Sequence, residues 1–241
     1  MSATSSASTE RPTASAGLDR ELASFYEDMA FPSRSSHAEY RRLLPDEPGE
    51  RIGDFGCGQS LFHEALRHYS PSPVFLDRSR NALSTIDYGH RVRADLRRLP
   101  FPSASYDRVL CIGVLHHLSD RSEAFHELAR VIRPGGALYL GVYAPGSLNA
   151  RLRRVYDSVG FSPFRAIVFA VTAFLIQCRY AMRGKLLALE DVRMRTTDFL
   201  KVPFVHFAEP VAYEAEAKSV GLRLESVRRI SSMNVLVLRQ G

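Results

Sequence analysis

Cysteine is scarce in this sequence, which contains only Cys57, Cys111 and Cys178 among its 241 residues. The count is odd and no Cys-x-x-Cys pair occurs, so the sequence shows neither a disulfide framework nor the ligand spacing of a zinc site. The clusters of acidic residues that would indicate another metal are missing too. We therefore expect no metal, and the low cysteine content fits a reducing, cytoplasmic compartment.

Lysine is equally rare. Only Lys185, Lys201 and Lys218 occur, although the chain has 32 basic residues and a formal net charge of +6. The arginines are spread along the chain, and neither zinc-finger spacing nor an aromatic-basic strand of the RNA-binding kind accompanies them. This bias towards arginine is typical of a GC-rich genome, and we expect no nucleic-acid partner.

Long hydrophobic runs are also absent. The longest, residues 166–176, lies between Arg165 and Arg179 and is shorter than the roughly 20 residues that a membrane-spanning helix needs. It is typical of a buried helix, a lid or a segment at a membrane interface. Residues 1–17 are rich in Ser, Thr and Ala. They lack the apolar core of a signal peptide and predict a disordered tail.

Apolar residues make up 45% of the chain, enough for one sizeable α/β domain with an insertion. Short apolar segments alternate with helical patterns up to residue 143. We expect helices at residues 18–31, 36–44, 61–68, 80–86 and 120–132, and strands at 51–55, 74–76, 91–94, 108–112 and 137–143. A capping box of Asp120 and Glu123 would begin the last helix, and a turn at 134–136 would precede the last strand.

The rest of the chain is organised differently. Residues 144–202 are rich in arginine, partly apolar and helical in pattern, which predicts an inserted helical lid. A helix at 210–220 and strands at 222–227 and 234–239, suited to antiparallel pairing, return to the core. The alternation predicts a doubly wound, Rossmann-like α/β fold with a mostly parallel sheet covered on both faces, formed by residues 18–143 and 203–241.

The strongest local signal is the segment Asp54-Phe55-Gly56-Cys57-Gly58-Gln59-Ser60, between the first strand and its helix. Glycines there let the chain turn tightly and let a ligand approach the backbone amides. Asp77 ends the next strand, where nucleotide-binding folds place an acid for the ribose hydroxyls. A plain turn and a helix N-cap are the alternatives. Leu61 stands where dinucleotide sites have a third glycine, which disfavours NAD and FAD.

Further motifs follow in order: Ala94-Asp95-Leu96, Leu99-Pro100-Phe101, Tyr106-Asp107-Arg108-Val109, Val114-Leu115-His116-His117-Leu118 and Arg133-Pro134-Gly135-Gly136. Together with the glycine segment and Asp77, they make residues 51–143 resemble the class I S-adenosylmethionine-dependent methyltransferases. The resemblance is to the small-molecule branch, which includes the quinone and natural-product methyltransferases. It implies a seven-stranded sheet with one antiparallel strand and one bound S-adenosylmethionine.

By position, the resemblance assigns eight residues to the cofactor: Asp54, Gly56, Gly58, Asp77, Asp95, Leu96, Ile112 and Gly113. Ser60, Arg78 and Tyr26 are further candidates for contacting it. Asp77 would accept from the ribose hydroxyls and Asp95 from the adenine amino group. Asp54 would act through the cofactor's ammonium or through the loop backbone. Tyr26 and Tyr40 would cap the cofactor, with packing in the core as an equal alternative.

Two of these residues depart from the family pattern. Ser60 replaces a common glycine and would turn the chain while its hydroxyl bonds the cofactor carboxylate. Arg78 places a positive charge near a cationic sulfonium, so we expect it to face solvent or to stack beside the adenine.

A methyl group on sulfonium is already activated, so the enzyme has mainly to align the nucleophile and exclude water. A general base is needed where the nucleophile must lose a proton. The candidates are His116, His117, His206 and Tyr143. Structural packing is the alternative for each histidine, and adjacent residues point different ways, so we expect at most one of His116 and His117 to face the acceptor.

The lid is expected to build the acceptor pocket from its apolar side chains: Phe161, Phe164, Ile167, Phe169, Val171, Phe174, Leu175 and Tyr180. Binding pockets are mostly apolar, so this composition predicts a small apolar or aromatic acceptor; packing of the lid itself is the alternative. The lid arginines would solvate its outer face or meet an acidic acceptor or an anionic membrane: Arg151, Arg153, Arg154, Arg165, Arg179 and Arg183.

The sequence therefore predicts S-adenosylmethionine-dependent methyl transfer to O, N or C of a small acceptor in natural-product biosynthesis. One alternative is a membrane-surface methyltransferase of a quinone or lipid. Another is a cofactor-binding scaffold that does not methylate. The acceptor and the oligomeric state stay open.

Overall fold

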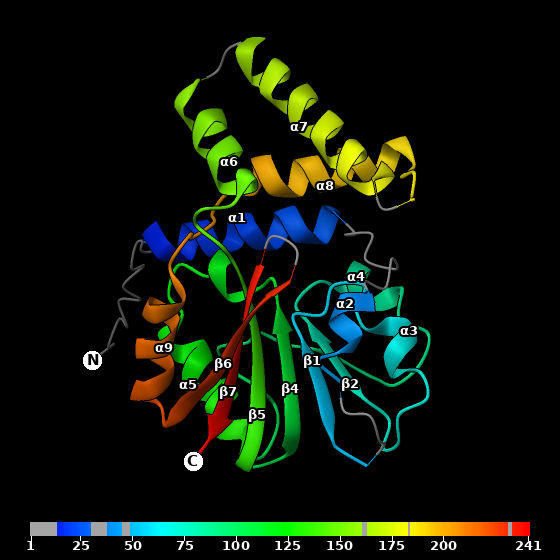
Figure 1. The fold of residues 1–241 in the computed structure, drawn as a ribbon. Helices are drawn as coiled ribbons and strands as arrows, with labels where there is room; N and C mark the ends of the chain where they lie inside the picture. Colours follow the sequence, from blue (N-terminus) through cyan, green and yellow to red (C-terminus); the bar gives the residue numbers. More distant parts are fainter. Residues whose placement is uncertain (1–13, 30–37, 45–48, 161–162, 183, 231–232) are drawn as a thin grey trace, which may run out of the picture.

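A seven-stranded sheet forms the centre of the protein (Figure 1). The computed structural model describes residues 14–29, 38–44, 49–160, 163–182, 184–230 and 233–241. The strands are β1 (Ile52–Phe55), β2 (Val74–Asp77), β3 (His90–Arg93), β4 (Tyr106–Ile112), β5 (Ile132–Tyr143), β6 (Leu222–Ile230) and β7 (Met233–Gln240). Their order is β3-β2-β1-β4-β5-β7-β6, and β7 runs antiparallel to both neighbours while the others are parallel. This arrangement confirms the predicted fold class.

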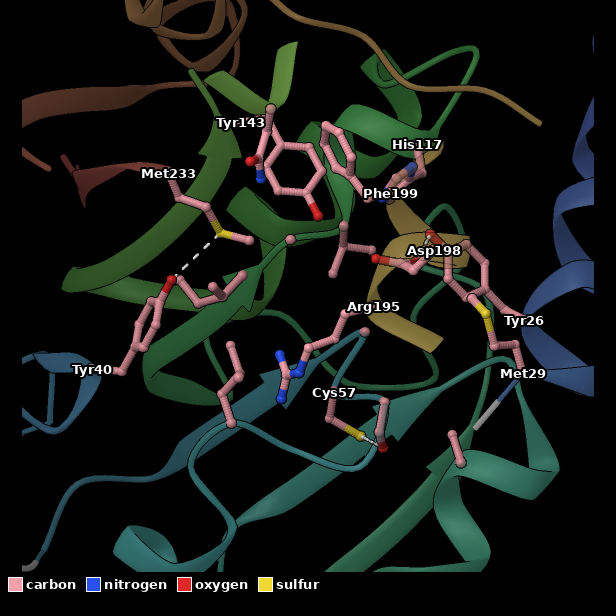
Figure 2. Close-up of a pocket in the computed structure, with 18 of the residues that line it drawn as sticks. Tyr26, Met29, Tyr40, Cys57, His117, Tyr143, Arg195, Asp198, Phe199 and Met233 are labelled. Atoms are coloured by element: carbon pink, nitrogen blue, oxygen red, sulfur yellow. Dashed lines mark hydrogen bonds between the residues drawn. The ribbon is translucent and has the colours of Figure 1, made fainter. Parts of the chain in front are cut away.

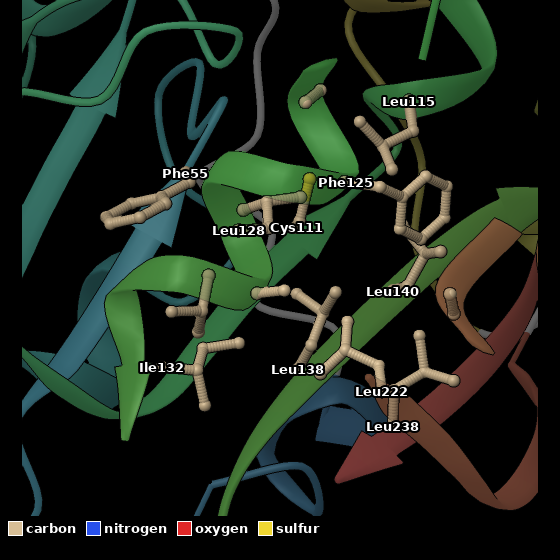
Figure 3. Packing of buried hydrophobic residues seen from close by; sticks show 14 of the residues in the cluster. Phe55, Cys111, Leu115, Phe125, Leu128, Ile132, Leu138, Leu140, Leu222 and Leu238 are labelled. Atoms are coloured by element: carbon tan, nitrogen blue, oxygen red, sulfur yellow. The ribbon is translucent and has the colours of Figure 1, made fainter. Parts of the chain in front are cut away.

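Helices cover both faces of the sheet. They are α1 (Ala14–Asp28), α2 (Ala38–Arg41), α3 (His63–Leu66), α4 (Arg80–Ser84), α5 (Ser122–Val131), α6 (Leu148–Ser158), α7 (Pro163–Ala181), α8 (Leu189–Lys201) and α9 (Pro210–Ser219), with a short 3-10 helix at Leu115–His117. The apolar side of α5 packs on one face of the sheet, where Phe125 and Leu128 lie against Leu138 and Leu140 of β5 (Figure 3). A second core on the other face packs α2, α3 and α4.

The structure corrects several predicted boundaries. The first helix begins at Ala14, four positions before Leu18, so the predicted tail of 1–17 was too long; residues 1–13 lie outside the described part. It ends at Asp28 rather than at residue 31. Helix α3 covers only His63–Leu66 of the predicted 61–68.

The predicted capping box does not form. Helix α5 begins one residue later than a cap at Asp120 requires, and its N-cap position, Arg121, makes no side-chain cap hydrogen bond. Asp120 instead accepts a hydrogen bond from the Ser122 backbone amide at 3.0 Å. The predicted turn at 134–136 lies inside β5, because Tyr106 pairs with Ile132 and Arg108 with Ala137, so residues 133–136 form a bulge.

The segment 144–202 forms α6, α7 and α8, which stand beyond the sheet and above α1 (Figure 1). Helix α1 lies between these helices and the carboxyl ends of β4 and β5. In open α/β sheets this edge is where ligands bind. We call residues 144–202 the lid.

Candidate functional site

The glycine loop after β1 is held by the neighbouring strand. The amides of Gly56 and Cys57 both donate to the carbonyl of Leu76, at 2.7 and 3.0 Å. Gly56 and Gly58 have φ of 69° and 54°, a left-handed conformation in which glycine avoids the steric cost of a Cβ. A Cβ added to Gly58 would meet no atom within 4 Å, so space lies beside the loop.

Asp77 ties this loop to β2. One carboxylate oxygen accepts from the Gly58 amide and the other from the Ser79 amide, each at 2.8 Å. The N-cap of α4 is Ser79, not Asp77, so the N-cap alternative for Asp77 does not hold. Burial raises the pKa of Asp77 although these hydrogen bonds oppose it. Each carboxylate oxygen has a further lone pair, so Asp77 keeps capacity to accept from a ribose hydroxyl.

Asp54 and Ser60 support the loop on its buried side, away from the cavity. Both are buried, neither lines the cavity, and the Ser60 hydroxyl donates to Asp54 at 2.6 Å. Ser60 has φ 59°, the conformation that a glycine would take, and its hydroxyl also accepts from the Phe62 amide. Burial raises the pKa of Asp54 to about 7, while the Ser60 hydrogen bond opposes the rise. Asp54 therefore contacts the loop through the Ser60 hydroxyl and does not reach the cavity.

Asp95 lies at the carboxyl side of β3 and pairs with Arg97. Burial favours a higher pKa for Asp95, but the hydrogen bonds from Arg97 outweigh it and hold the pKa below its ordinary value. Arg97 also bridges to Asp19 of α1, whose other carboxylate oxygen accepts from Ser119 at 3.1 Å. These contacts fix α1 across the end of the site that holds Asp95.

A cavity of about 690 Å³ joins these elements to the lid. Its volume is that of a small-molecule site. The predicted cofactor residues that line it are Tyr26, Gly56, Gly58, Asp77, Arg78, Asp95, Leu96, Ile112 and Gly113. Open space beside Gly58, with acids on two successive strand ends, fits S-adenosylmethionine.

The structure separates the four predicted base candidates. His117 and Tyr143 line the cavity, whereas His116 and His206 do not. His116 is fully buried between His117 and Tyr143, with ring centroids 4.2 Å from each, and neither of its ring nitrogens has a hydrogen-bond partner among the described residues. His206 is tied to it through the backbone, its amide donating to the His116 carbonyl at 2.7 Å.

His117 and Tyr143 are both neutral at physiological pH. The Nδ1 atom of His117 lies 2.9 Å from the carbonyl oxygen of Phe204, which only accepts, so Nδ1 carries the proton and Nε2 the lone pair. Burial lowers the pKa of His117 to about 4, which makes it a weak base. Burial also raises the pKa of Tyr143 well above its ordinary value, so Tyr143 stays a phenol.

Asp198 and Arg195 of α8 are cavity residues that the sequence analysis missed. Figure 2 shows both within the cavity, with Asp198 beside Tyr26. Asp198 accepts a hydrogen bond from the Tyr26 hydroxyl at 3.1 Å. Burial raises the pKa of Asp198 to about 6, although the Tyr26 hydrogen bond opposes the rise. The only signal in the sequence is an acid beside the apolar pair Phe199-Leu200.

The lid supplies fewer of its predicted pocket residues than expected. Leu175 and Tyr180 line the cavity, together with Leu152, Ile176 and Phe199. Several predicted pocket residues instead face solvent: Phe164, Ile167, Val171 and Phe174. Phe169 packs under Lys201 instead of lining the cavity, and Phe161 lies outside the described residues.

Known methyltransferases resemble this chain both in sequence and in fold. A family model described as a methyltransferase domain matches residues 53–140. The malonyl-[acyl-carrier protein] O-methyltransferase of Pseudescherichia vulneris is 31% identical over 183 residues, covering 71% of this chain and 72% of that protein. The 27-O-demethylrifamycin SV methyltransferase of Amycolatopsis mediterranei is 35% identical over 132 residues, 48% of each protein.

The chain thus spans about half of the rifamycin enzyme, and 32% or less of the mammalian probable tRNA methyltransferases 9B that it also matches. Among solved structures, the 1,6-didemethyltoxoflavin-N1-methyltransferase of Burkholderia thailandensis, with bound S-adenosylhomocysteine, superposes with a TM-score of 0.59. That match has 13% identity and covers 96% of this chain and 92% of the other. At this identity the likeness concerns the fold alone.

Proposed function

The chain belongs to the class I S-adenosylmethionine-dependent methyltransferases, and on that premise we propose that it methylates a small, largely apolar or aromatic acceptor at O, N or C. Its cofactor is S-adenosylmethionine. The observation that supports a small acceptor is the continuity of the cavity. The same space is lined by Gly58 and Asp77 at the sheet edge and by Phe199 and Asp198 from the lid.

The cofactor end is built by the loop and the strand ends. When bound, S-adenosylmethionine supplies a methyl group on a positively charged sulfur, which becomes a neutral thioether once an acceptor lone pair has taken the methyl. Asp77 and Asp95 would hold the ribose and the adenine, as the resemblance implies. Arg78 also lines this end of the cavity. The salt bridge between Arg97 and Asp19 holds α1 over this end of the cavity and helps exclude water from it.

Asp198, which lines the cavity from α8 of the lid, is our candidate for the proton acceptor. A general base works best when its pKa lies near the working pH. The pKa of Asp198 is about 6 and that of His117 about 4, so Asp198 is the stronger base of the two. The Tyr26 hydroxyl fixes the orientation of its carboxylate. For a hydroxyl acceptor, the proton passes to Asp198 as the new O–CH₃ bond forms.

A role in natural-product biosynthesis is supported by the rifamycin relative. A cytoplasmic location is supported by three free cysteines. A nucleic-acid acceptor is disfavoured because the described cavity is lined mainly by apolar side chains beneath the lid. A scaffold without methylation is the alternative if S-adenosylmethionine does not bind.

The test is calorimetric titration with S-adenosylmethionine and S-adenosylhomocysteine. We expect stoichiometric binding that Asp77→Ala weakens more than tenfold, and we expect no change in Asp120→Ala, whose exposed side chain lies outside the cavity. Release of S-adenosylhomocysteine is then screened over phenols, amines and activated carbon acids. Absence of binding by the native protein would remove the proposed function, and equal affinity in Asp77→Ala would remove the ribose assignment.

A further inference from the structure

The outer face of α7 is apolar along its whole length. Every exposed residue of this helix is apolar: Pro163, Phe164, Ala166, Ile167, Ala170, Val171, Phe174 and Ala181. Ile167 and Phe174 are 57% and 67% exposed. The exposed stripe continues to the start of α8, where Leu186, before the helix, and Leu189, its first residue, are also exposed. We call this surface, from Pro163 to Leu189, the lid stripe.

Helix α7 is longer than the apolar run suggested. Its 19 residues reach the length and apolar character of a membrane-crossing helix, and 6% of its most apolar window is buried. It does not stand free, however, because Leu175 and Ile176 line the cavity and Arg165 packs over the ring of Tyr156 of α6. A spanning helix would have to leave these contacts, whereas a helix lying in the plane of a membrane interface keeps them.

The net positive charge of the protein lies in the lid, which contains the lid stripe. Residues 144–202 contain ten Lys and Arg and four Asp and Glu, a net of +6. The rest of the chain has 22 of each sign and is neutral overall. An apolar stripe on a positively charged segment is the pattern that binds anionic membrane surfaces.

These observations favour a membrane over a protein as the occupant of the lid stripe. Protein interfaces carry about one hydrogen bond per 100–200 Å², but the exposed residues of α7 are all apolar, and its polar residues Arg165, Gln177 and Arg179 are partly buried. Hydrocarbon requires no such partner. A second copy of the chain is disfavoured because two lids, each with a net charge of +6, would then face each other.

We propose that the lid stripe docks on an anionic bilayer, with α7 lying in the interface. The cavity reaches the surface beside it, since Leu148 and Met182 both line the cavity and are 57% and 82% exposed. A lipophilic acceptor dissolved in the bilayer can then enter from the membrane side, a consequence that rests on the proposed function.

The chain has no tryptophan, which allows a sharp test with Phe174→Trp as a single-tryptophan probe. We expect its emission to shift to shorter wavelength on adding vesicles of phosphatidylcholine with phosphatidylglycerol, and much less with phosphatidylcholine alone. Val211→Trp is the matched control, because Val211 is equally exposed, at 67%, but lies on α9 of the core. No shift for Phe174→Trp, or an equal shift for the control, would overturn the proposal.

Vesicle flotation of the full chain provides the second readout. We expect Ile167→Ser with Phe174→Ser to lower partitioning at least about tenfold, and Arg151→Gln with Lys185→Gln to lower it about fivefold or more. Arg223→Gln, on the core strand β6, should change it little. Dimerisation abolished by the serine variants, without vesicle binding, would identify a second copy as the occupant and refute membrane docking.

The cofactor titration separates this inference from the proposed function. Both vesicle experiments are done without cofactor or acceptor, and neither Ile167 nor Phe174 lines the cavity. Vesicle binding without S-adenosylhomocysteine binding would refute only the methyltransferase proposal. Unchanged S-adenosylhomocysteine affinity in the serine variants would show that their core is folded.

Discussion

The buried carboxyl of Asp198 makes opposite predictions for stability and for activity. Burial raises its pKa from 3.8 to about 6 in the folded protein, and an unfolded chain restores the ordinary value. Between these two pH values the folded state binds more protons than the unfolded state. The free energy of unfolding therefore falls as pH rises from about 4 to about 6. This rise in the pKa of Asp198 corresponds to about 3 kcal/mol of stability lost by pH 7.

The variant Asp198→Asn removes this titration and keeps an oxygen that accepts from Tyr26. We expect its stability relative to the native protein to rise by about 3 kcal/mol between pH 4 and pH 7. Urea unfolding of both proteins at each pH measures this difference, and the titration of Asp54 occurs in both and cancels. Parallel pH curves for the two proteins would refute the buried, titrating carboxyl.

The same variant should lose activity while it gains stability. Loss of a general base typically lowers turnover by about 10²–10⁴-fold, and the remaining activity should lose the dependence on a group of pKa about 6. S-adenosylhomocysteine release with a hydroxyl acceptor measures both. Unchanged S-adenosylhomocysteine affinity would separate this effect from damage to the cofactor end, and a variant as active as the native protein would leave Asp198 without a catalytic role.

Three further predictions concern the loop and α1. Ser60→Ala should lower the free energy of unfolding by roughly 1–3 kcal/mol, because it leaves buried Asp54 without its donor; Ser60→Gly should cost less because it relieves the positive φ of 59°, and equal losses in urea unfolding would contradict this. Gly56→Ala should abolish S-adenosylhomocysteine binding in calorimetry, because the new Cβ would lie 2.5 Å from the side chain of Val114 and would distort the loop. Tyr26→Phe should raise the pKa of Asp198 further, because it removes a hydrogen bond that opposes the rise. The pH at which the rate falls on the acid side should then move upward, and an unchanged pH profile would show that Tyr26 does not affect Asp198.

The cofactor end could be predicted from the sequence because its residues lie close together along the chain. A βα loop and the next strand end form a local unit, so the motif spacing places Gly58 and Asp77 together before any tertiary contact is known. The hydrogen bond between Ser60 and Asp54 could not be predicted from the sequence. Both the positive φ and the inward hydroxyl depend on the packing behind the loop.

The part of the cavity that meets the lid was predicted less well because it is assembled from distant segments. Tyr26 and Asp198 are 172 positions apart and meet only because α8 folds back over α1 (Figure 1). His116 and His117 are adjacent, and which one faces the cavity is set by the 3-10 turn that follows β4. Residue type alone favours histidine as a base, whereas burial makes His117 a weaker base than Asp198.

The orientation of α7 shows why apolar periodicity failed in the lid. A helix whose apolar residues cover most of its surface does not indicate which side is buried, and predominantly apolar helices occur in large cores or in membranes. Here Leu175 and Ile176 face the cavity while Phe174 faces outward. One side of α7 therefore lines the cavity that we propose for the acceptor. The other side carries the apolar residues that the protein's own core leaves exposed, and it is the side that we propose to dock on a bilayer.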